Sequence, residues 1–206
     1  MDLETFLLLL PIVLVSLTLH ELAHAYVAWR LGDPTAKSEG RLTLNPLVHL
    51  DPFGTLMFAL TALVANLPFG WARPVPVNPG YFRRPKEGMA VVAAAGPAMN
   101  FVLALLCLAV VRHVDLGERW FEVVANAYIV NVILGLFNLI PVPPLDGSRI
   151  VGVLMDNATY IRWVQLDQVG MLIVFGAFFI FRDEFTTLLD GALDQVTRAM
   201  DVVVMA

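Results

Sequence analysis

The strongest constraint on the fold of this 206-residue chain is a set of long stretches without any charged side chain. Residues 52–72, 88–111 and 123–145 contain no Asp, Glu, Lys or Arg. A helix needs about 20 apolar residues to cross the hydrocarbon core of a bilayer, so these stretches have the length of membrane segments. Two further candidates, 5–29 and 163–181, are apolar but include ionisable residues. We therefore expect an all-α polytopic membrane protein with a helical core of four to six membrane segments.

The overall composition points the same way. Hydrophobic residues make up 58% of the chain and charged residues 15%, with a mean hydropathy of +0.74. Soluble domains are roughly 45–50% apolar and about 25% charged, so the lipid bilayer is an expected partner. The net charge of −5 leaves no basic stripe, which argues against nucleic acid as a partner. The single cysteine, Cys107, excludes an intrachain disulfide.

Nothing in the sequence divides the chain into several folded units. It contains no internal repeat, no low-complexity tract and no linker, and it carries no signal for an oligomeric state. Charged and apolar residues are mixed in the last part of the chain, 183–206. We expect residues 1–182 to form one membrane domain and residues 183–206 to form an interfacial or soluble C-terminal tail.

Basic residues in the loops predict the orientation in the membrane. No Lys or Arg precedes the first apolar segment, whereas the following loops, 30–41 and 73–86, are basic. Because cytoplasmic loops carry an excess of Lys and Arg, the N-terminus is expected outside and both loops inside. Segment 52–72 lies between these two loops and is interrupted by Pro68 and Gly70. It should therefore dip into the membrane and return on the same side.

Two short pieces of the loops have the composition of β-strands. Residues 41–45 and 74–78 alternate in polarity or are β-branched, and Pro and Asn interrupt them. Prolines restrict such strands to sheet edges. We expect short β-strand pieces in the cytoplasmic-side loops, with an edge that could accept an extended substrate.

The first apolar segment contains the motif His20-Glu21-Leu22-Ala23-His24. On a helix the two histidines are one turn apart, so both imidazoles can bind one Zn²⁺ at about 2.0–2.1 Å. Glu21 can then act as the general base that takes a proton from a water attacking a peptide carbonyl.

The alternative interpretation is a group of polar residues at a helix–helix interface. Three ionisable groups so close together are costly in hydrocarbon, at about 2.5–3.5 kcal/mol for a charged residue at the helix centre. Such a cluster needs a metal ion or a water-filled cavity, and this requirement favours a metal site.

A catalytic zinc ion usually has three protein ligands and one open position. Beyond the two motif histidines the chain contains only His49 and His113, and His113 is expected at the outer surface. Asp146 is the stronger candidate, because it directly follows an apolar run that ends in a proline cluster. Prolines leave backbone groups without helical partners, and in a membrane these groups must line a polar cavity.

These motifs together resemble the site-2 protease family of intramembrane zinc metalloproteases. The resemblance is carried by the HExxH motif, by Gly96-Pro97-Ala98-Met99-Asn100-Phe101, and by the element that runs from Asn138 to the Asp146-Gly147 pair. It extends from His20 to about Gly152 and matches the compact members that lack a PDZ domain.

The resemblance implies that His20, His24 and Asp146 bind one Zn²⁺ per chain and that Glu21 is the general base. It implies a helical membrane core with the zinc toward the cytoplasmic face. The expected activity is that of a zinc metalloendopeptidase that hydrolyses peptide bonds of transmembrane protein substrates within the cell membrane. The alternative is a membrane zinc transporter or metal-binding scaffold, which would use the same ligands without needing Glu21.

Three further residues are candidates for contact with substrate. The amides of Asn100 and Asn138 lie in apolar segments and need partners, which could be the oxyanion or the substrate backbone. His49 could lie at the entrance of the active site, or it could cap a turn together with Asp51. For Gly96, close helix packing and close approach to the zinc site are equally compatible with the sequence.

Overall fold

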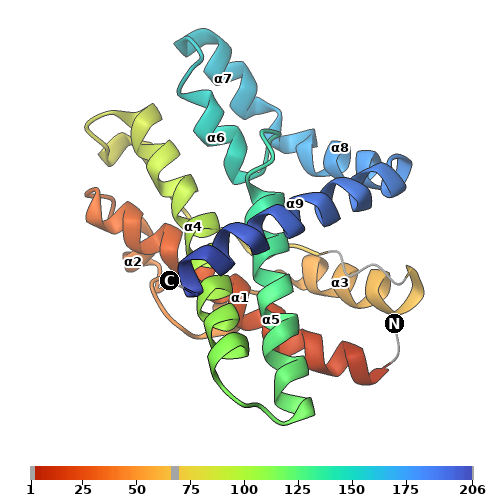
Figure 1. The fold of residues 1–206 in the computed structure, drawn as a ribbon. Helices are drawn as coiled ribbons and strands as arrows, with labels where there is room; N and C mark the ends of the chain where they lie inside the picture. Colours follow the sequence, from red (N-terminus) through yellow and green to blue (C-terminus); the bar gives the residue numbers. More distant parts are fainter. Residues whose placement is uncertain (1–2, 66–69, 206) are drawn as a thin grey trace.

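The computed structural model of the chain describes residues 3–65 and 70–205, and its regular elements are helices (Figure 1). The element order is α1 (Leu3–Arg30), α2 (Thr35–Ser38), η1 (Pro46–Val48), α3 (Pro52–Ala65), η2 (Pro79–Tyr81), α4 (Pro85–His113), α5 (Glu118–Asn138), α6 (Asp146–Gly152), α7 (Asn157–Gln165), α8 (Asp167–Ile180) and α9 (Arg182–Val204).

The membrane core is formed by α1, α4 and α5. Within the described residues these three helices are long and apolar enough to span a bilayer. Helix α4 is central, since it packs against α1, α5 and α6. Helix α9 runs across α4 and α5 (Figure 1) and places Leu193 and Met200 against a buried cluster that includes Leu108 and Val132. The chain is therefore a multi-pass membrane protein.

The expectation of four to six membrane segments is wrong for the described part of the chain, which has three. Stretch 163–181 does not form one continuous helix: α7 ends at Gln165 and α8 begins at Asp167. The Asp167 carboxylate is paired with Arg149 at the first turn of α8. The 14 residues of α8 extend over about 21 Å, which is less than the roughly 30 Å of hydrocarbon.

The two ends of the segment between the basic loops lie next to each other. Leu50 and Ala72 form an isolated antiparallel bridge, and the Arg73 N–H donates to the carbonyl of His49 at 2.8 Å. Helix α3, between them, has only 14 residues. Residues 66–69, including Pro68, lie outside the described residues. Because its two ends pair with each other, the segment returns to the side from which it starts.

The predicted β-strand pieces are wrong. In the part of the chain that the structure describes, β-type pairing is limited to the isolated bridge between Leu50 and Ala72. Neither 41–45 nor 74–78 belongs to a strand. Side chains, and not a neighbouring strand, form hydrogen bonds with the backbone N–H groups of these pieces. In the first piece the Asn45 N–H donates to the Thr43 hydroxyl, and the Asn45 side chain accepts from Leu47 N–H. In the second, the N–H groups of Val75 and Asn78 donate to the carboxylates of Glu21 and Asp33, and the prolines have none to offer.

Candidate metal centre

The side chains of His20, His24 and Asp146 meet in the core. The two Nε2 atoms of the histidines are 3.0 Å apart. Asp146 Oδ2 lies 3.2 Å from Nε2 of His20 and 3.3 Å from Nε2 of His24. Both histidines are buried, and these three residues form a group whose ligand atoms all lie within 4.8 Å of one another.

Two separate elements bring these residues together. The histidines lie one turn apart on α1, as their spacing predicts, and Asp146 is the first residue of α6. Gly147 allows α6 to begin at this place, because a Cβ there would clash with the carbonyls of Leu139 and Ile140 at the end of α5. A residue without a side chain at position 147 therefore lets the chain fold back tightly enough to present the Asp146 carboxylate.

Hydrogen bonds at the far side of each ring show which nitrogen carries the proton. His24 Nδ1 lies 2.7 Å from the carbonyl oxygen of Val92, and His20 Nδ1 lies 2.6 Å from Oδ1 of Asn100. These oxygens only accept, so both Nδ1 atoms carry hydrogen. In the neutral rings the lone pairs then lie on the Nε2 atoms, which face each other and Asp146.

This arrangement fits a bound cation. Three electron-pair donors face one another, and the buried Asp146 Oδ2 has no hydrogen-bond partner. Their separations of 3.0–3.3 Å resemble the roughly 3.3 Å edges of a tetrahedron with metal–ligand bonds of about 2.0–2.1 Å. Two imidazoles and one carboxylate are also a donor set used by catalytic zinc sites.

Gly96 on α4 closes one side of the cluster. A Cβ at this position would come within 2.5 Å of Nε2 of His20 and closer still to Nε2 of His24. Of the two roles considered for Gly96, the geometry therefore favours close approach to the metal centre.

Glu21 lies beside the cluster and is buried, with its carboxylate bound to an extended segment that follows α3. The Val75 N–H donates to Oε2 of Glu21 at 2.9 Å. Arg41 holds this segment in place by donating from Nη2 to the carbonyls of Arg73 and Pro74. Burial lowers the pKa of the Arg41 guanidinium, and the neighbouring Arg73 lowers it further.

The remaining candidates from the sequence occupy different places. Asn100 is fully buried and contacts His20. Asn138 donates its amide to the carbonyl of Leu134, one turn earlier on its own helix. His49 is buried, and its Nε2 lies 3.1 Å from the Thr43 carbonyl rather than at the metal cluster. Asp51 caps α3 through the Gly54 N–H and does not share a turn contact with His49.

Asn131 is a polar residue of this region that sequence reasoning missed. It is buried on α5, and its side chain is hydrogen-bonded to Asn100. The signal was available in principle: Asn131 lies in the uncharged stretch 123–145, as Asn138 does, and a buried amide needs partners there.

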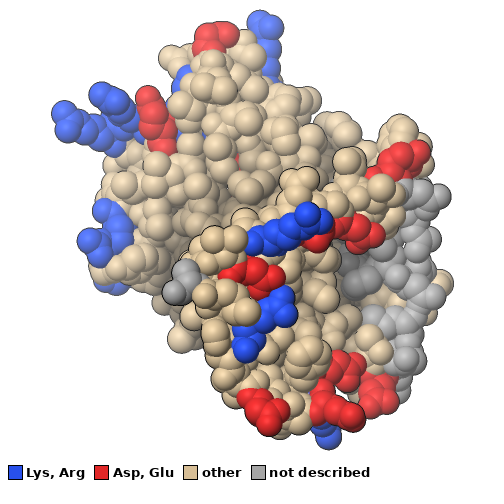
Figure 2. Space-filling view, viewed as in Figure 1, with Lys and Arg blue, Asp and Glu red and all other residues tan. Residues whose placement is uncertain are grey.

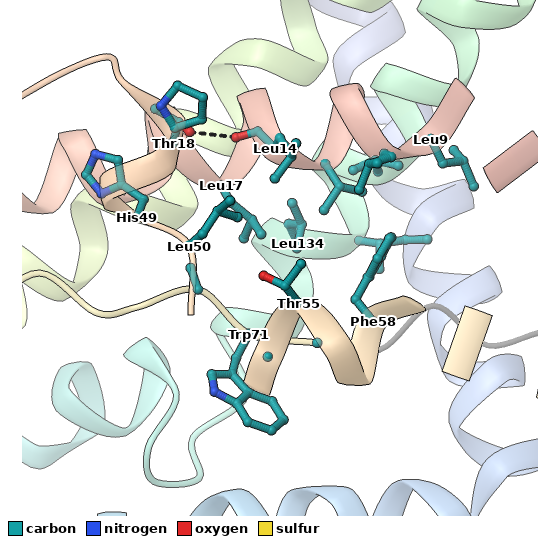
Figure 3. A pocket seen from close by; sticks show the side chains of 18 residues that line it. Leu9, Leu14, Leu17, Thr18, His49, Leu50, Thr55, Phe58, Trp71 and Leu134 are labelled. Atoms are coloured by element: carbon teal, nitrogen blue, oxygen red, sulfur yellow. Dashed lines mark hydrogen bonds between the residues drawn. The ribbon is translucent and has the colours of Figure 1, made fainter. Parts of the chain in front are cut away.

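An apolar cavity of about 180 Å³ lies between α1, α3 and α5 (Figure 3). Leu14 and Leu17 of α1, Phe58 of α3 and Leu134 of α5 contribute side chains to its wall, and Trp71 lies at another side. Leu17 is one helical turn before Glu21, and Trp71 begins the extended segment that reaches Val75. The cavity wall is therefore close in sequence to both partners of the hydrogen bond between Val75 and Glu21.

Comparison with known proteins identifies the family. Residues 114–182 match Peptidase family M50, a region that includes Asp146. The chain is 43% identical over 173 residues to YwhC of Bacillus subtilis, assigned as a zinc metalloprotease, covering 78% of this chain and 75% of YwhC. It is 33% identical over 172 residues to Rip2 of Mycolicibacterium smegmatis, which has the same assignment, covering 82% of this chain and 65% of Rip2.

An archaeal protein is similar as well. The zinc metalloprotease MJ0392 of Methanocaldococcus jannaschii is 27% identical over 146 residues, which cover 71% of this chain and 34% of MJ0392. No solved structure matches the chain. The similarity to YwhC is high and spans three quarters of that protein, so the chain belongs to peptidase family M50, the site-2 family of intramembrane zinc metalloproteases.

Proposed function

We propose that His20, His24 and Asp146 hold the zinc ion of this intramembrane metalloprotease and that Glu21 is its general base. The observation that carries the proposal is the convergence of two Nε2 lone pairs and one carboxylate oxygen, 3.0–3.3 Å apart, with the ring hydrogens directed elsewhere. Zinc bound there supplies Lewis-acid polarisation of the scissile carbonyl and lowers the pKa of water.

Glu21 performs the proton transfers. One of its carboxylate oxygens, Oε2, is held by the Val75 N–H, which fixes the orientation of the carboxylate. The carboxylate takes a proton from the attacking water as the C–O bond forms. It returns that proton to the amine nitrogen as the peptide C–N bond breaks. Asn100 acts on the histidine rather than on substrate, because its amide is bonded to His20 and Asn131.

The substrate is proposed to be a transmembrane protein segment with a bulky apolar side chain near the cut bond. The cavity, whose wall includes Leu17 one helical turn before Glu21, is lined mainly by apolar residues, six of them leucines, and its volume is about 180 Å³. An apolar cavity of about 150 Å³ is enough to take up a benzene ring. A Leu or Phe side chain of the substrate therefore suits this site in size and polarity.

We propose that the centre faces the cytoplasmic side of the cell membrane, with the N-terminus outside. In Figure 2, Lys and Arg predominate at the end of the molecule where α1 ends and α4 begins, and Asp and Glu predominate at the opposite end, beside the loop between α4 and α5. The excess of basic residues in cytoplasmic loops supports this orientation. Labelling of single cysteines introduced at Arg83 and Asp115 tests it: Asp115→Cys should react from outside, and Arg83→Cys only after permeabilisation.

The decisive test of the mechanism is Glu21→Gln in the purified protein. The variant should keep one zinc per chain and lose cleavage of a model membrane substrate, since the amide cannot accept the proton. Cleavage at the wild-type rate by Glu21→Gln would exclude this residue as the base. Zinc uptake into proteoliposomes by both proteins, without cleavage by either, would instead support the transporter alternative.

A further inference from the structure

A chain of side-chain hydrogen bonds leads from His20 away from the metal cluster and into α5. His20 Nδ1 lies 2.6 Å from Oδ1 of Asn100, and Asn100 Nδ2 donates to Oδ1 of Asn131 at 2.9 Å. Asn131 Nδ2 in turn donates to Ser16 Oγ and to the carbonyl of Ala127, each at 2.9 Å. Asn131 is 3% exposed and Asn100 is fully buried, so both amides are largely shielded from solvent.

The direction of the whole chain is fixed at its far end. The carbonyl of Ala127 can only accept, so the atom of Asn131 that faces it must be the nitrogen. The other atom of this amide is then an oxygen, and the atom of Asn100 that faces it must be a nitrogen. Asn100 therefore presents its oxygen to His20, and that oxygen requires a hydrogen on Nδ1 of the ring. Nε2 of His20 is left with its lone pair toward His24 and Asp146.

From this geometry we infer that Asn131 is a positioning residue of the metal centre, which sets the tautomer of His20 through Asn100. The inference rests on the proposed role of His20 as a zinc ligand. His24 needs no such relay, because its Nδ1 donates directly to the backbone carbonyl of Val92, which cannot turn over. An asparagine amide can flip, which exchanges its oxygen and its nitrogen. The hydrogen bond to Asn131 holds the Asn100 amide in one of these two orientations. Outer partners of this kind change metal affinity by about 10–100-fold.

Substitutions at position 131 separate this role from simple packing. Asn131→Leu keeps a similar branched shape but leaves the Asn100 amide without its acceptor. Asn100 can then present its nitrogen to His20, which favours the tautomer with hydrogen on Nε2 and blocks that ligand atom. Asn131→Asp keeps an oxygen acceptor for Asn100, whether or not the acid is ionised. Asn126→Leu is the matched control, because Asn126 is an amide on the same helix that donates to the Glu122 carbonyl and has no contact with the cluster.

The test measures zinc affinity of the full-length protein in detergent micelles by competition with a chromophoric chelator. Asn131→Leu should bind zinc about 10–100-fold more weakly than wild type. Asn131→Asp should restore most of this affinity, and Asn126→Leu should equal wild type. Equal affinity of wild type and a folded Asn131→Leu would overturn the inference.

A second measurement needs no variant at position 131. The ¹⁵N chemical shifts of the zinc-free wild-type protein, assigned by comparison with His20→Ala, report the tautomer of the ring. Hydrogen on Nδ1 supports the inference, and hydrogen on Nε2 overturns it even where Asn131→Leu does not fold. Failure of the proposed function looks different: wild type would bind no zinc, or His20→Ala would bind it as wild type does.

Discussion

Gly96 on α4 lies so close to the imidazole of His24 on α1 that no side chain fits between them. A Cβ at position 96 would overlap Nε2 of both motif histidines, the two atoms proposed to bind zinc. Neighbouring Pro97 is also fully buried inside α4. The close approach of the two helices at this point is therefore part of the geometry of the metal centre.

The first prediction is that Gly96→Ala weakens zinc binding by about 10–100-fold, because the histidine rings must move away from the added methyl group. Zinc content after dialysis against a weak chelator measures the effect. Gly176→Ala is the control: Gly176 also lies inside an apolar helix, and a Cβ there has open space. Equal zinc retention by Gly96→Ala and Gly176→Ala would show that α4 does not restrict the rings.

The parts of the site that depend on local spacing were predictable from the sequence. His20, Glu21 and His24 lie within a single helix, whose 3.6-residue period fixes how they are related. Asp146 could be inferred because a carboxylate that follows an apolar run must find a partner, although its distance from α1 does not follow from the sequence. Each of these predictions used one element at a time, and the structure brings the side chains of His20, His24 and Asp146 together.

The errors concern contacts between distant segments. The 74–78 piece is extended, but Val75 and Asn78 donate to the carboxylates of Glu21 and Asp33 instead of to a neighbouring strand. No pattern within the segment identifies those partners. Position in an uncharged stretch marks Asn131 as an amide that needs partners, but its partner Asn100 lies 31 positions away in the sequence, so its role could not be predicted. Asp167, at the start of the short helix α8, pairs with Arg149, which is also a tertiary contact.

The second prediction concerns the bond between Val75 and Glu21. Val75→Pro removes the N–H that holds the Glu21 carboxylate, whereas Val75→Ala keeps it. A hydrogen bond to a charged group contributes about 1.5–3 kcal/mol, so kcat/KM of Val75→Pro should fall roughly tenfold or more. Zinc content and the thermal unfolding midpoint of both variants establish that they fold alike. The role assigned to this bond is wrong if the two variants cleave equally well.

The third prediction concerns the apolar cavity. Leu134→Phe narrows it, so cleavage of substrates with Leu or Phe near the cut bond should fall more than cleavage of the matching Ala substrate. A change in an apolar pocket of this kind alters relative kcat/KM by roughly tenfold or more. Ile129→Phe is the control, because Ile129 is exposed on the same helix and does not line the cavity. An equal reduction for all substrates would indicate that lipid, rather than substrate, occupies the cavity.

The fourth prediction is that zinc stabilises the folded protein and that the stabilisation requires Asp146. A ligand that binds only the folded state, at a free concentration of 100 times its Kd, raises the free energy of unfolding by about 2.7 kcal/mol. For a chain of this size that corresponds to a rise in Tm of roughly 5–10 °C when zinc is returned to chelator-treated protein. Asp146→Ala should show no such rise, because the two histidines alone bind zinc weakly.

The control for this measurement is Asp194→Ala, which removes an exposed carboxylate that pairs with Arg198 on α9, far from the cluster in sequence. It should show the full zinc-dependent rise in Tm. If Asp146→Ala responds to zinc as strongly as Asp194→Ala does, the third ligand must come from another residue. Because Tm is measured without substrate, this outcome would not depend on whether Glu21 is the base.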